Sequence, residues 1–555
     1  MDVDRRTFLR AALGTAGALA LASCTRSEQT PEAAPDPSVP SPRITLRLPG
    51  GDYGFPSPFA HLPPGYARMI LIYDTLLSSD ATGALVPWLA SRYERSADGL
   101  TYTFEMRDNV RWHDGRPLTA DDVVFSFDYF AAKRSRLPPF VLSRPEYVSR
   151  VSAPGPRTVQ VRLTKPVVTF ERAVAGRFPI VPKHVWSSID DPARAQDVKV
   201  LVGSGPYRLE SYTRGQGSYL YTANDDFFLG KPFVRRMELP AVDDELNALR
   251  AGKLDVGGPP SNGTPVGRAV LSPFRSDKAY RVIEGPAEFP SALYWNLAKG
   301  GPLADVRFRR ACALAIDRDD LVKRVLGGLG TPGNPGFLPP DHPFHVDVEQ
   351  YSFDRTGAER LLDEAGYRRS GSKGPRQAPD GKPLRVKLTV LPVLSALVDL
   401  VVNRLEAVGI QLELDPTEPF QLFTGQVDYE MAIFFYGGVS GDADYMRTAY
   451  SSRGNGGFQR ARGYADAELD DLADRQLVTF DEAERKRLVG RMQQIAARDI
   501  PLLHLYYPTP FSVVQRAVFD QWTFARETGG PLNKATFVTG TSSPGLTIRP
   551  TREGG

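Results

Sequence analysis

The chain has 555 residues, of which 41% are hydrophobic and 24% are charged, and its formal net charge is +3. At roughly 150 residues per domain, this length predicts three to four domains or two large lobes, with enough core to need no disulfide or metal for stability. The nearly neutral charge argues against a nucleic-acid binder, and two cysteines exclude a disulfide-rich scaffold and a multi-cysteine zinc site.

The N-terminus has the features of an export signal. Residues 1–23 begin with a charged segment containing Arg5 and Arg6, and an apolar stretch rich in alanine and glycine follows over 11–22. This stretch is too short to cross a hydrocarbon core as a helix, which takes about 20 residues. The paired arginines, followed by Phe8 and Leu9, resemble a twin-arginine signal, so we predict a signal peptide over 1–23.

Cys24 ends the apolar stretch, and Leu21-Ala22-Ser23-Cys24 resembles a bacterial lipobox. We expect its thiol to be acylated, because several acyl chains at about 0.8 kcal/mol per buried CH₂ anchor a protein stably. The alternative is an ordinary cleavage site with a chance cysteine. Residues 24–42 would then be the lipidated cysteine and a proline-rich, disordered tether. The expected location is the outer face of the cytoplasmic membrane, on the cell surface or periplasmic side.

The remaining chain alternates strand and helix patterns, which predicts an α/β class with mixed sheets. Residues 101–107 alternate polar and apolar side chains, and Thr119 then precedes a helix with Asp121 and Asp122 in its first turn. A strand over 386–391, a helix ending at Gly409 and a strand over 410–414 predict a βαβ unit. The other elements we predict are strands over 43–48, 429–436 and 502–507, and helices over about 465–477 and 481–498.

Motifs of nucleotide-binding and hydrolytic enzymes are absent or misplaced. Residues 328–333 fit G-x-G-x-x-G, but a helical pattern precedes them and Pro332 forbids a helix after them, so we interpret them as a helix C-cap and loop. No P-loop motif occurs, and no nucleophile, base and orienting group assemble. Cys312 lies in a helical pattern and is predicted to be a buried small side chain. We therefore predict no enzymatic activity and no cofactor.

One histidine pair raises the question of a metal. His342 and His345, with Asp347 and Glu349, carry the side chains that ligate metals. Pro343 argues against a helical pair, and the surrounding loop is polar. We predict a solvated loop and no metal site.

Eight sequence blocks, in order over about 43–545, point to one family. They include Tyr73-Asp74-Thr75-Leu76-Leu77, Pro87-Trp88-Leu89-Ala90, Val110-Arg111-Trp112-His113-Asp114-Gly115, Gly203-Ser204-Gly205-Pro206-Tyr207, Tyr294-Trp295-Asn296 and Tyr506-Tyr507-Pro508. Together they resemble the family 5 extracellular solute-binding proteins of ABC importers, the receptors for peptides, oligosaccharides and nickel chelates.

The resemblance implies a two-lobed fold like that of type II periplasmic binding proteins, closing on a ligand by hinge motion. The first, larger lobe would comprise residues 43–285 and 508–545, with an extra subdomain over 67–199. The second lobe would comprise residues 286–507. The chain would cross between the lobes twice.

The same resemblance implies a ligand cleft lined by an N-terminal loop, the segment after the first crossover and a glycine loop of the second lobe. The residues it assigns are Tyr53, Phe55, Tyr294, Trp295, Asn296, Tyr436, Gly437, Gly438, Val439, Ser440, Asp442 and Asp444. The alternatives are core packing for Trp295 and Tyr436 and an exposed turn for the two aspartates. Aromatic faces suit sugar rings or peptide side chains.

One departure from the family concerns the ligand. Peptide receptors of this family carry a carboxylate in the glycine loop that pairs with the peptide's ammonium, and here that position is Val439. A buried ammonium without a partner is costly, so Asp442 or Asp444 would have to replace it, or the ligand is not a peptide. We expect a peptide or similar polar oligomer, with an oligosaccharide as the alternative.

The expected partners are ABC permease and ATPase subunits and, through the lipid anchor, the membrane; we expect no nucleic acid and a monomeric receptor. Less favoured functions are a receptor serving as a chaperone or in signalling without transport, and a secreted hydrolase.

Overall fold

The structure, a computed structural model, describes residues 45–518 and Trp522. Within that range it leaves out residues 62–64, 81–82, 138–144, 233, 259–265, 287–289, 370, 372–373, 419–420, 422–426, 436–440 and 455–459. The predicted signal peptide, Cys24 and the tether therefore lie outside the described residues. Among the described residues, no helix has the length and apolar character needed to cross a membrane.

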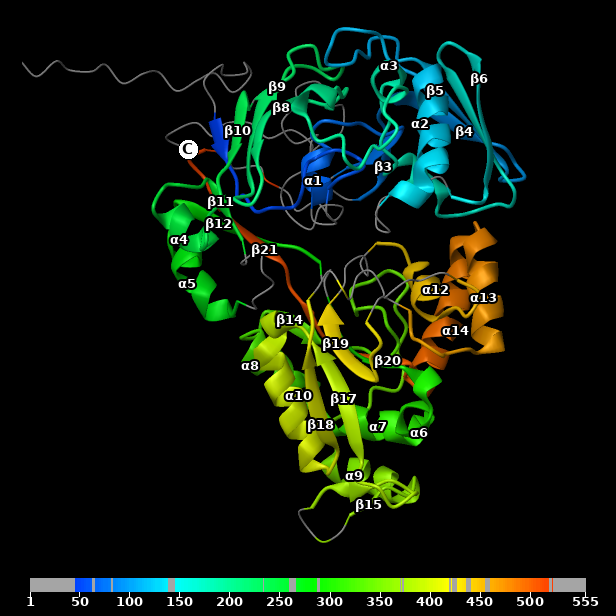
Figure 1. Cartoon of the computed structure of the whole chain (residues 1–555), viewed down its shortest axis with the longest axis vertical. Helices are drawn as coiled ribbons and strands as arrows, with labels where there is room; N and C mark the ends of the chain where they lie inside the picture. The colour runs from blue at the N-terminus through cyan, green and yellow to red at the C-terminus, as the bar shows by residue number, and fades with distance from the viewer. Residues whose placement is uncertain are drawn as a thin grey trace, which may run out of the picture.

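Two bodies of mixed α/β structure are stacked in the fold, and a small sheet joins them along one side (Figure 1). The upper body in the figure contains three sheets, ordered β1-β10-β9-β8, β4-β5-β7-β6 and β2-β3. Their strands are β1 (Thr45–Arg47), β2 (Leu77–Ser79), β3 (Leu85–Pro87), β4 (Ala90–Arg95), β5 (Thr101–Met106), β6 (Val148–Gly155), β7 (Thr158–Leu163), β8 (Tyr207–Thr213), β9 (Ser218–Ala223) and β10 (Arg236–Leu239).

The helices of the upper body begin where the sequence supplies a cap or a turn. They are α1 (Tyr66–Met69), α2 (Ala120–Lys133) and α3 (Lys183–Trp186), with a π-helical turn at Glu171–Ala175. Helix α2 confirms the predicted start, because the Thr119 N–H donates to the Asp122 carboxylate at 3.0 Å. In β5 the side chains are alternately buried and half-buried, as the period-2 pattern predicts.

Asp74 shows what the family-like blocks do in the fold. Its fully buried carboxylate accepts from the Trp88 indole N–H at 2.8 Å and from the Ser204 hydroxyl at 2.7 Å. Three separate blocks thus meet at one buried carboxylate. These blocks stabilise the upper body, since burying the Asp74 carboxylate without hydrogen-bond partners would be costly.

The joining sheet has the order β11-β21-β12, with β11 (Val256–Gly257), β12 (Tyr280–Glu284) and β21 (Phe511–Gln515). Helices α4 (Glu245–Arg250) and α5 (Arg268–Ser276) lie beside it (Figure 1). The chain leaves this sheet after β12 and returns at β21, so both crossovers start or end here.

The lower body is built on one six-stranded mixed sheet of order β14-β20-β13-β19-β17-β18. Its strands are β13 (Ser291–Trp295), β14 (Gly330–Pro332), β17 (Arg385–Val390), β18 (Gln411–Pro416), β19 (Met431–Phe435) and β20 (Leu502–Pro508), with a separate pair β15 (Arg368–Arg369) and β16 (Arg376–Gln377). Its helices are α6 (Gly301–Ala304), α7 (Val306–Ala315), α8 (Arg318–Val325), α9 (Arg355–Glu364), α10 (Ser395–Ala407), α12 (Tyr445–Tyr450), α13 (Ala467–Val478) and α14 (Glu482–Asp499).

The predicted βαβ unit is confirmed, because β17 precedes α10 in the chain, β18 follows it, and the two strands pair in parallel. The interpretation of residues 328–333 as a C-cap and loop is partly wrong. Gly327 and Gly328 have positive φ after α8, as a C-cap requires, but Gly330–Pro332 forms β14 by pairing with β20. That pairing depends on a strand far along the chain.

The apolar core divides between the bodies. One cluster of buried residues lies in the lower body and contains Cys312, which is fully buried as predicted, and burial raises the pKa of its thiol. Another lies in the upper body and includes Trp112. A small third cluster lies under α4 and α5 and includes Phe511. The lobe boundaries at 285/286 and 507/508 remain a prediction, because sheet membership does not measure independent movement.

Candidate functional site

Loops at the carboxyl ends of β1 and β10 lie side by side, and the predicted N-terminal site loop is one of them. The two strands pair in parallel, so their carboxyl ends share one edge. Just beyond it, the Gly50 N–H donates to the Pro240 carbonyl at 2.8 Å. A Cβ at Gly50 would lie 2.4 Å from that carbonyl oxygen, so only glycine fits. This edge is a candidate site because it carries the N-terminal loop that the family resemblance assigns to the ligand cleft.

Tyr53 is held in this loop by contacts on both sides. Its N–H donates to the Tyr219 hydroxyl at 3.1 Å, and that hydroxyl donates to the Gly54 carbonyl at 2.9 Å. The side chain of Tyr53 is half-buried, whereas Phe55 is only 3% exposed and packs near Tyr212. Of these two predicted site residues, only Tyr53 presents part of its ring at the surface.

Arg68 on α1 is a buried cation that the sequence did not single out. It is 8% exposed, its Cζ lies 4.2 Å from the Tyr53 ring centroid, and its Nη2 donates to the Pro49 carbonyl at 3.0 Å. Its Nε has no hydrogen-bond partner among the described residues. A half-buried aromatic ring stacked on a buried cation fixes the shape of this edge.

Glu245, in the first turn of α4, is a buried carboxyl group that interacts electrostatically with Arg68. It is 9% exposed, and its Oε2 accepts from the Gly258 N–H at 2.8 Å. Burial raises the pKa of its carboxyl to about 7, although that hydrogen bond and the charge of Arg68 lower it. In the sequence Glu245 resembles an ordinary acidic residue of a helix start, so no local signal distinguishes it.

The second-lobe residues predicted after the first crossover are buried in the core. Tyr294 and Trp295 are fully buried, and the Tyr294 ring stacks on Phe434 with centroids 3.9 Å apart. The Asn296 amide donates to the Tyr429 carbonyl at 3.0 Å. Because β13 starts at the crossover, its direction carries Trp295 and Asn296 toward the strand end remote from the crossover. A ligand role for these residues stays a prediction.

The glycine loop, with the predicted site residues Tyr436, Gly437, Gly438, Val439 and Ser440, lies outside the described residues. Strand β19, which precedes the loop, runs antiparallel to β13 and pairs Phe435 with Ser291 at the crossover end. Its arrow points toward the upper body in Figure 1.

Asp442 follows the loop and is bound by an arginine. Both of its oxygens accept from Arg485 on α14, one of them at 3.1 Å, and Arg485 is almost fully buried. Burial raises the pKa of the Asp442 carboxyl, but the hydrogen bonds and charge of Arg485 outweigh it and hold that pKa below its ordinary value.

Asp444 is held in the same way. Both of its oxygens accept from Arg447 at 2.7 Å, and one also accepts from the Gln476 amide. Neither aspartate is an exposed turn residue as the alternative predicted, and each carboxylate already pairs with a cation.

The two bodies also touch at the corner opposite the joining sheet, where α13 and α14 lie below β4 and β6 (Figure 1). The Val168 N–H of the upper body donates to the Leu477 carbonyl of α13 at 2.8 Å. Leu477 packs in the upper hydrophobic cluster. The bodies are therefore in contact at this corner as well as at the joining sheet.

The histidine loop is solvated as predicted at Asp341, Pro343, Asp347 and Glu349, which are exposed, and differs from the prediction at His342. His342 is 6% exposed rather than solvated, and its Nδ1 accepts from the Phe344 N–H at 3.1 Å. The His345 Nε2 lies 3.7 Å from the Asp347 Oδ1. Among the described residues, no three His, Cys, Asp or Glu side chains are grouped as a metal site requires.

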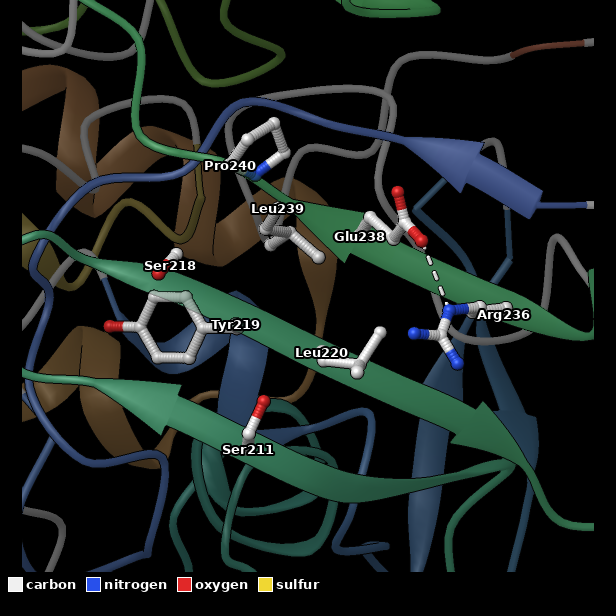
Figure 2. A pocket seen from close by; sticks show the side chains of 8 residues that line it. All are labelled: Ser211, Ser218, Tyr219, Leu220, Arg236, Glu238, Leu239 and Pro240. Carbon is white, nitrogen blue, oxygen red and sulfur yellow. Dashed lines mark hydrogen bonds and ion pairs between the residues drawn. The ribbon is translucent and has the colours of Figure 1, made fainter.

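A shallow hollow of 240 Å³ lies on the face of the β8-β9-β10 sheet (Figure 2). Its cation and anion, Arg236 and Glu238, pair with each other at 3.0 Å. Drug-sized ligands occupy about 300–1,000 Å³. Because it is small and none of the predicted site residues lines it, we do not assign it as the ligand site.

Comparison with known proteins gives consistent matches. The sequence matches the bacterial extracellular solute-binding proteins, family 5 Middle, over residues 84–458. It is 26% identical over 475 residues to the dipeptide-binding protein of Escherichia coli K12, covering 81% of this chain and 86% of that protein. The structure of an oligopeptide-binding protein from Bacillus subtilis with a nonapeptide matches with a TM-score of 0.75 at 21% identity, covering 89% of this chain and 99% of that one. A periplasmic oligopeptide-binding protein from Thermotoga maritima with bound mannohexaose matches with a TM-score of 0.69 at 26% identity, covering 86% and 93%.

Proposed function

The chain belongs to the family 5 bacterial extracellular solute-binding proteins and has their two-lobed type II fold, and from that premise we propose that it captures a peptide for an ABC importer. Its role as an exported substrate-binding receptor follows from the family. The peptide ligand, the permease and ATPase partners, the lipid anchor and the monomeric state belong to the proposal. So does the absence of catalysis, since the family consists of binding proteins.

The observation that carries the proposal is the pair of crossovers at one joining sheet. Strands β12 and β21 pair over Tyr280–Glu284 and Phe511–Gln515; β12 precedes the crossover into the lower body, and β21 follows the crossover back from it. Two neighbouring crossovers form a natural hinge, because few residues must change φ and ψ for the bodies to close. In this proposal the moving lobes are residues 43–285 with 508–545, and residues 286–507.

Two charged side chains of the first lobe, Arg68 and Glu245, favour a peptide over a sugar. Arg68 and Glu245 are a buried cation and a buried carboxyl group that interact electrostatically, and they suit a ligand that carries both charges. Tyr53 suits either class. The mannohexaose-bound relative keeps the oligosaccharide as the second candidate.

Calorimetry tests the ligand class. We expect a mixture of alanine di- to pentapeptides to release or absorb heat on binding, and cello-oligosaccharides to give none. Heat from the sugars alone contradicts the peptide assignment and leaves the receptor role intact.

The lipid anchor is tested separately at Cys24. In cells fed a labelled fatty acid, we expect label on the wild-type chain and none on Cys24→Ser, which should also leave the membrane fraction. The matched control is Cys312→Ser, which should keep the label. A labelled Cys24→Ser chain contradicts the assignment.

A further inference from the structure

We propose that Glu245 is the carboxylate that binds the ammonium group of the ligand, in place of the carboxylate that Val439 lacks. This inference rests on the proposed function, because only an amine-bearing ligand has such a group. It assigns the recognition of charge to the first lobe, at the joining sheet, rather than to the glycine loop.

The two aspartates that follow the glycine loop are poor substitutes. Asp442 pairs with Arg485, and Asp444 pairs with Arg447. An ammonium that displaced either arginine would leave a largely buried guanidinium without its partner, which typically costs 3–5 kcal/mol. A carboxylate that is free of cations is a better site.

Glu245 meets that condition. No cation lies within 4.0 Å of its carboxylate among the described residues, and its recorded hydrogen bond is the one from the Gly258 N–H to Oε2. The nearby Arg68 instead stacks on Tyr53 and donates to Pro49. Among the residues that the structure describes, the other oxygen of this buried carboxylate accepts no hydrogen bond, and we assign it to the ligand. Its raised pKa has the same origin, since burial without a paired cation disfavours the ionised form.

The position of Glu245 also fits a receptor that closes. A Cβ on Gly258 would lie 3.4 Å from Glu245 Oε2 and 3.5 Å from the carbonyl oxygen of Phe511. Phe511 is the first residue of β21, where the chain returns from the lower body. The carboxylate therefore lies beside the crossover. A cation bound there lies where the two lobes join.

Calorimetry with two peptide mixtures tests the proposal on the purified full chain. The probes are alanine di- to pentapeptides with free N-termini and the same peptides N-acetylated. We expect the wild type to bind the free mixture at least tenfold more tightly than the acetylated one. Glu245→Gln, which keeps an acceptor for the Gly258 N–H, should lose tenfold to a hundredfold in affinity and no longer distinguish the mixtures. The matched control, Glu210→Gln on β8, should behave as wild type.

The outcomes separate the two proposals. If Glu245→Gln still prefers the free peptides, another group binds the ammonium, and the inference is wrong while the peptide receptor stands. Equal wild-type affinity for both mixtures also overturns the inference alone. If the wild type binds neither mixture, the peptide assignment itself fails. Should Glu245→Gln not fold, Glu245→Asp decides: retained discrimination with weaker binding supports the inference, and unchanged affinity contradicts it.

Discussion

The guanidinium carbon of Arg95, on β4 of the upper body, lies 3.8 Å from the ring centroid of Phe480, between α13 and α14 of the lower body. The Phe480 ring also fits against Gly99, where a Cβ would lie 3.0 Å from it. With the Val168–Leu477 hydrogen bond, this contact joins the lobes far from the crossovers. The hinge closure proposed above would therefore bend or break a second junction.

Removing this contact should weaken the coupling between the lobes. Half-exposed cation–π pairs contribute about 0.5–1 kcal/mol, so a double-mutant cycle with Arg95→Ala and Phe480→Ala should give a coupling of that size in the free energy of unfolding. Urea denaturation measures it. A control cycle that pairs Arg92→Ala, at an exposed position of the same strand, with Phe480→Ala should give no coupling energy. A coupling energy of zero in both cycles would mean that the Arg95–Phe480 contact is not formed in solution.

Asp442 should matter for stability and not for ligand binding. We expect Asp442→Asn to lower the free energy of unfolding by about 3 kcal/mol, because Arg485 stays buried without its anion. The exposed Asp471→Asn is the control and should change little. Ligand affinity of the folded variant should stay within twofold of wild type. A large loss of affinity with unchanged stability would instead make Asp442 a ligand residue.

The same pair predicts a pH dependence. Arg485 holds the pKa of Asp442 below its ordinary value of 3.8, so the folded state binds the proton less readily than the unfolded state. The stabilisation is therefore complete above that value and is lost as the pH falls through the lower, folded pKa. The stability gap between wild type and Asp442→Asn should narrow below about pH 4, which acid titration of circular dichroism would detect.

Glu245 predicts a pH dependence of stability opposite in sign to that of Asp442. Its pKa is raised from 4.5 to about 7, so the folded state holds a proton that the unfolded state releases, and stability should fall as the pH rises between those values. The groups acting on it are Arg68 on α1, Asp244 beside it and the Gly258 N–H. The loss should be on the order of 3 kcal/mol and absent in Glu245→Gln. Identical pH profiles for the two proteins would contradict the burial that we describe.

Trp295 distinguishes a core residue from a ligand residue. Because it is fully buried at the strand end remote from the crossover, we expect Trp295→Phe to cost about 1–3 kcal/mol of stability and to leave ligand affinity unchanged. Tyr53→Ala should weaken ligand binding and change stability little, since the half-buried Tyr53 lies in the loop beyond the carboxyl end of β1. Thermal unfolding and calorimetry on both variants give the comparison. Weaker binding by a stable Trp295→Phe would support the ligand role that the family resemblance assigns to it.

Local patterns predicted the parts of the fold that depend on neighbouring residues. The Thr119 cap and the β17–α10–β18 unit follow from spacing within about thirty residues, and the structure confirms both. The β14 strand was missed because it exists only through β20, and the burial of His342 was missed because distant packing creates it. Long-range pairing does not appear in a local pattern.

The candidate site was less predictable for the same reason. The family resemblance locates loops, but it does not say which charges in them are already paired. Arg485 lies 43 residues from Asp442, and the burial that raises the pKa of Glu245 comes from packing that the helix-start pattern does not show. The sequence therefore identified the receptor family, whereas the charge pairs needed coordinates.

Mass spectrometry of the small molecules released on denaturing the protein purified from its own cells tests the central claim most directly. The account predicts peptides with free N-termini at up to one per chain, and their loss from Glu245→Gln purified in parallel. Oligosaccharides in their place, with no peptide released from either protein, would contradict it.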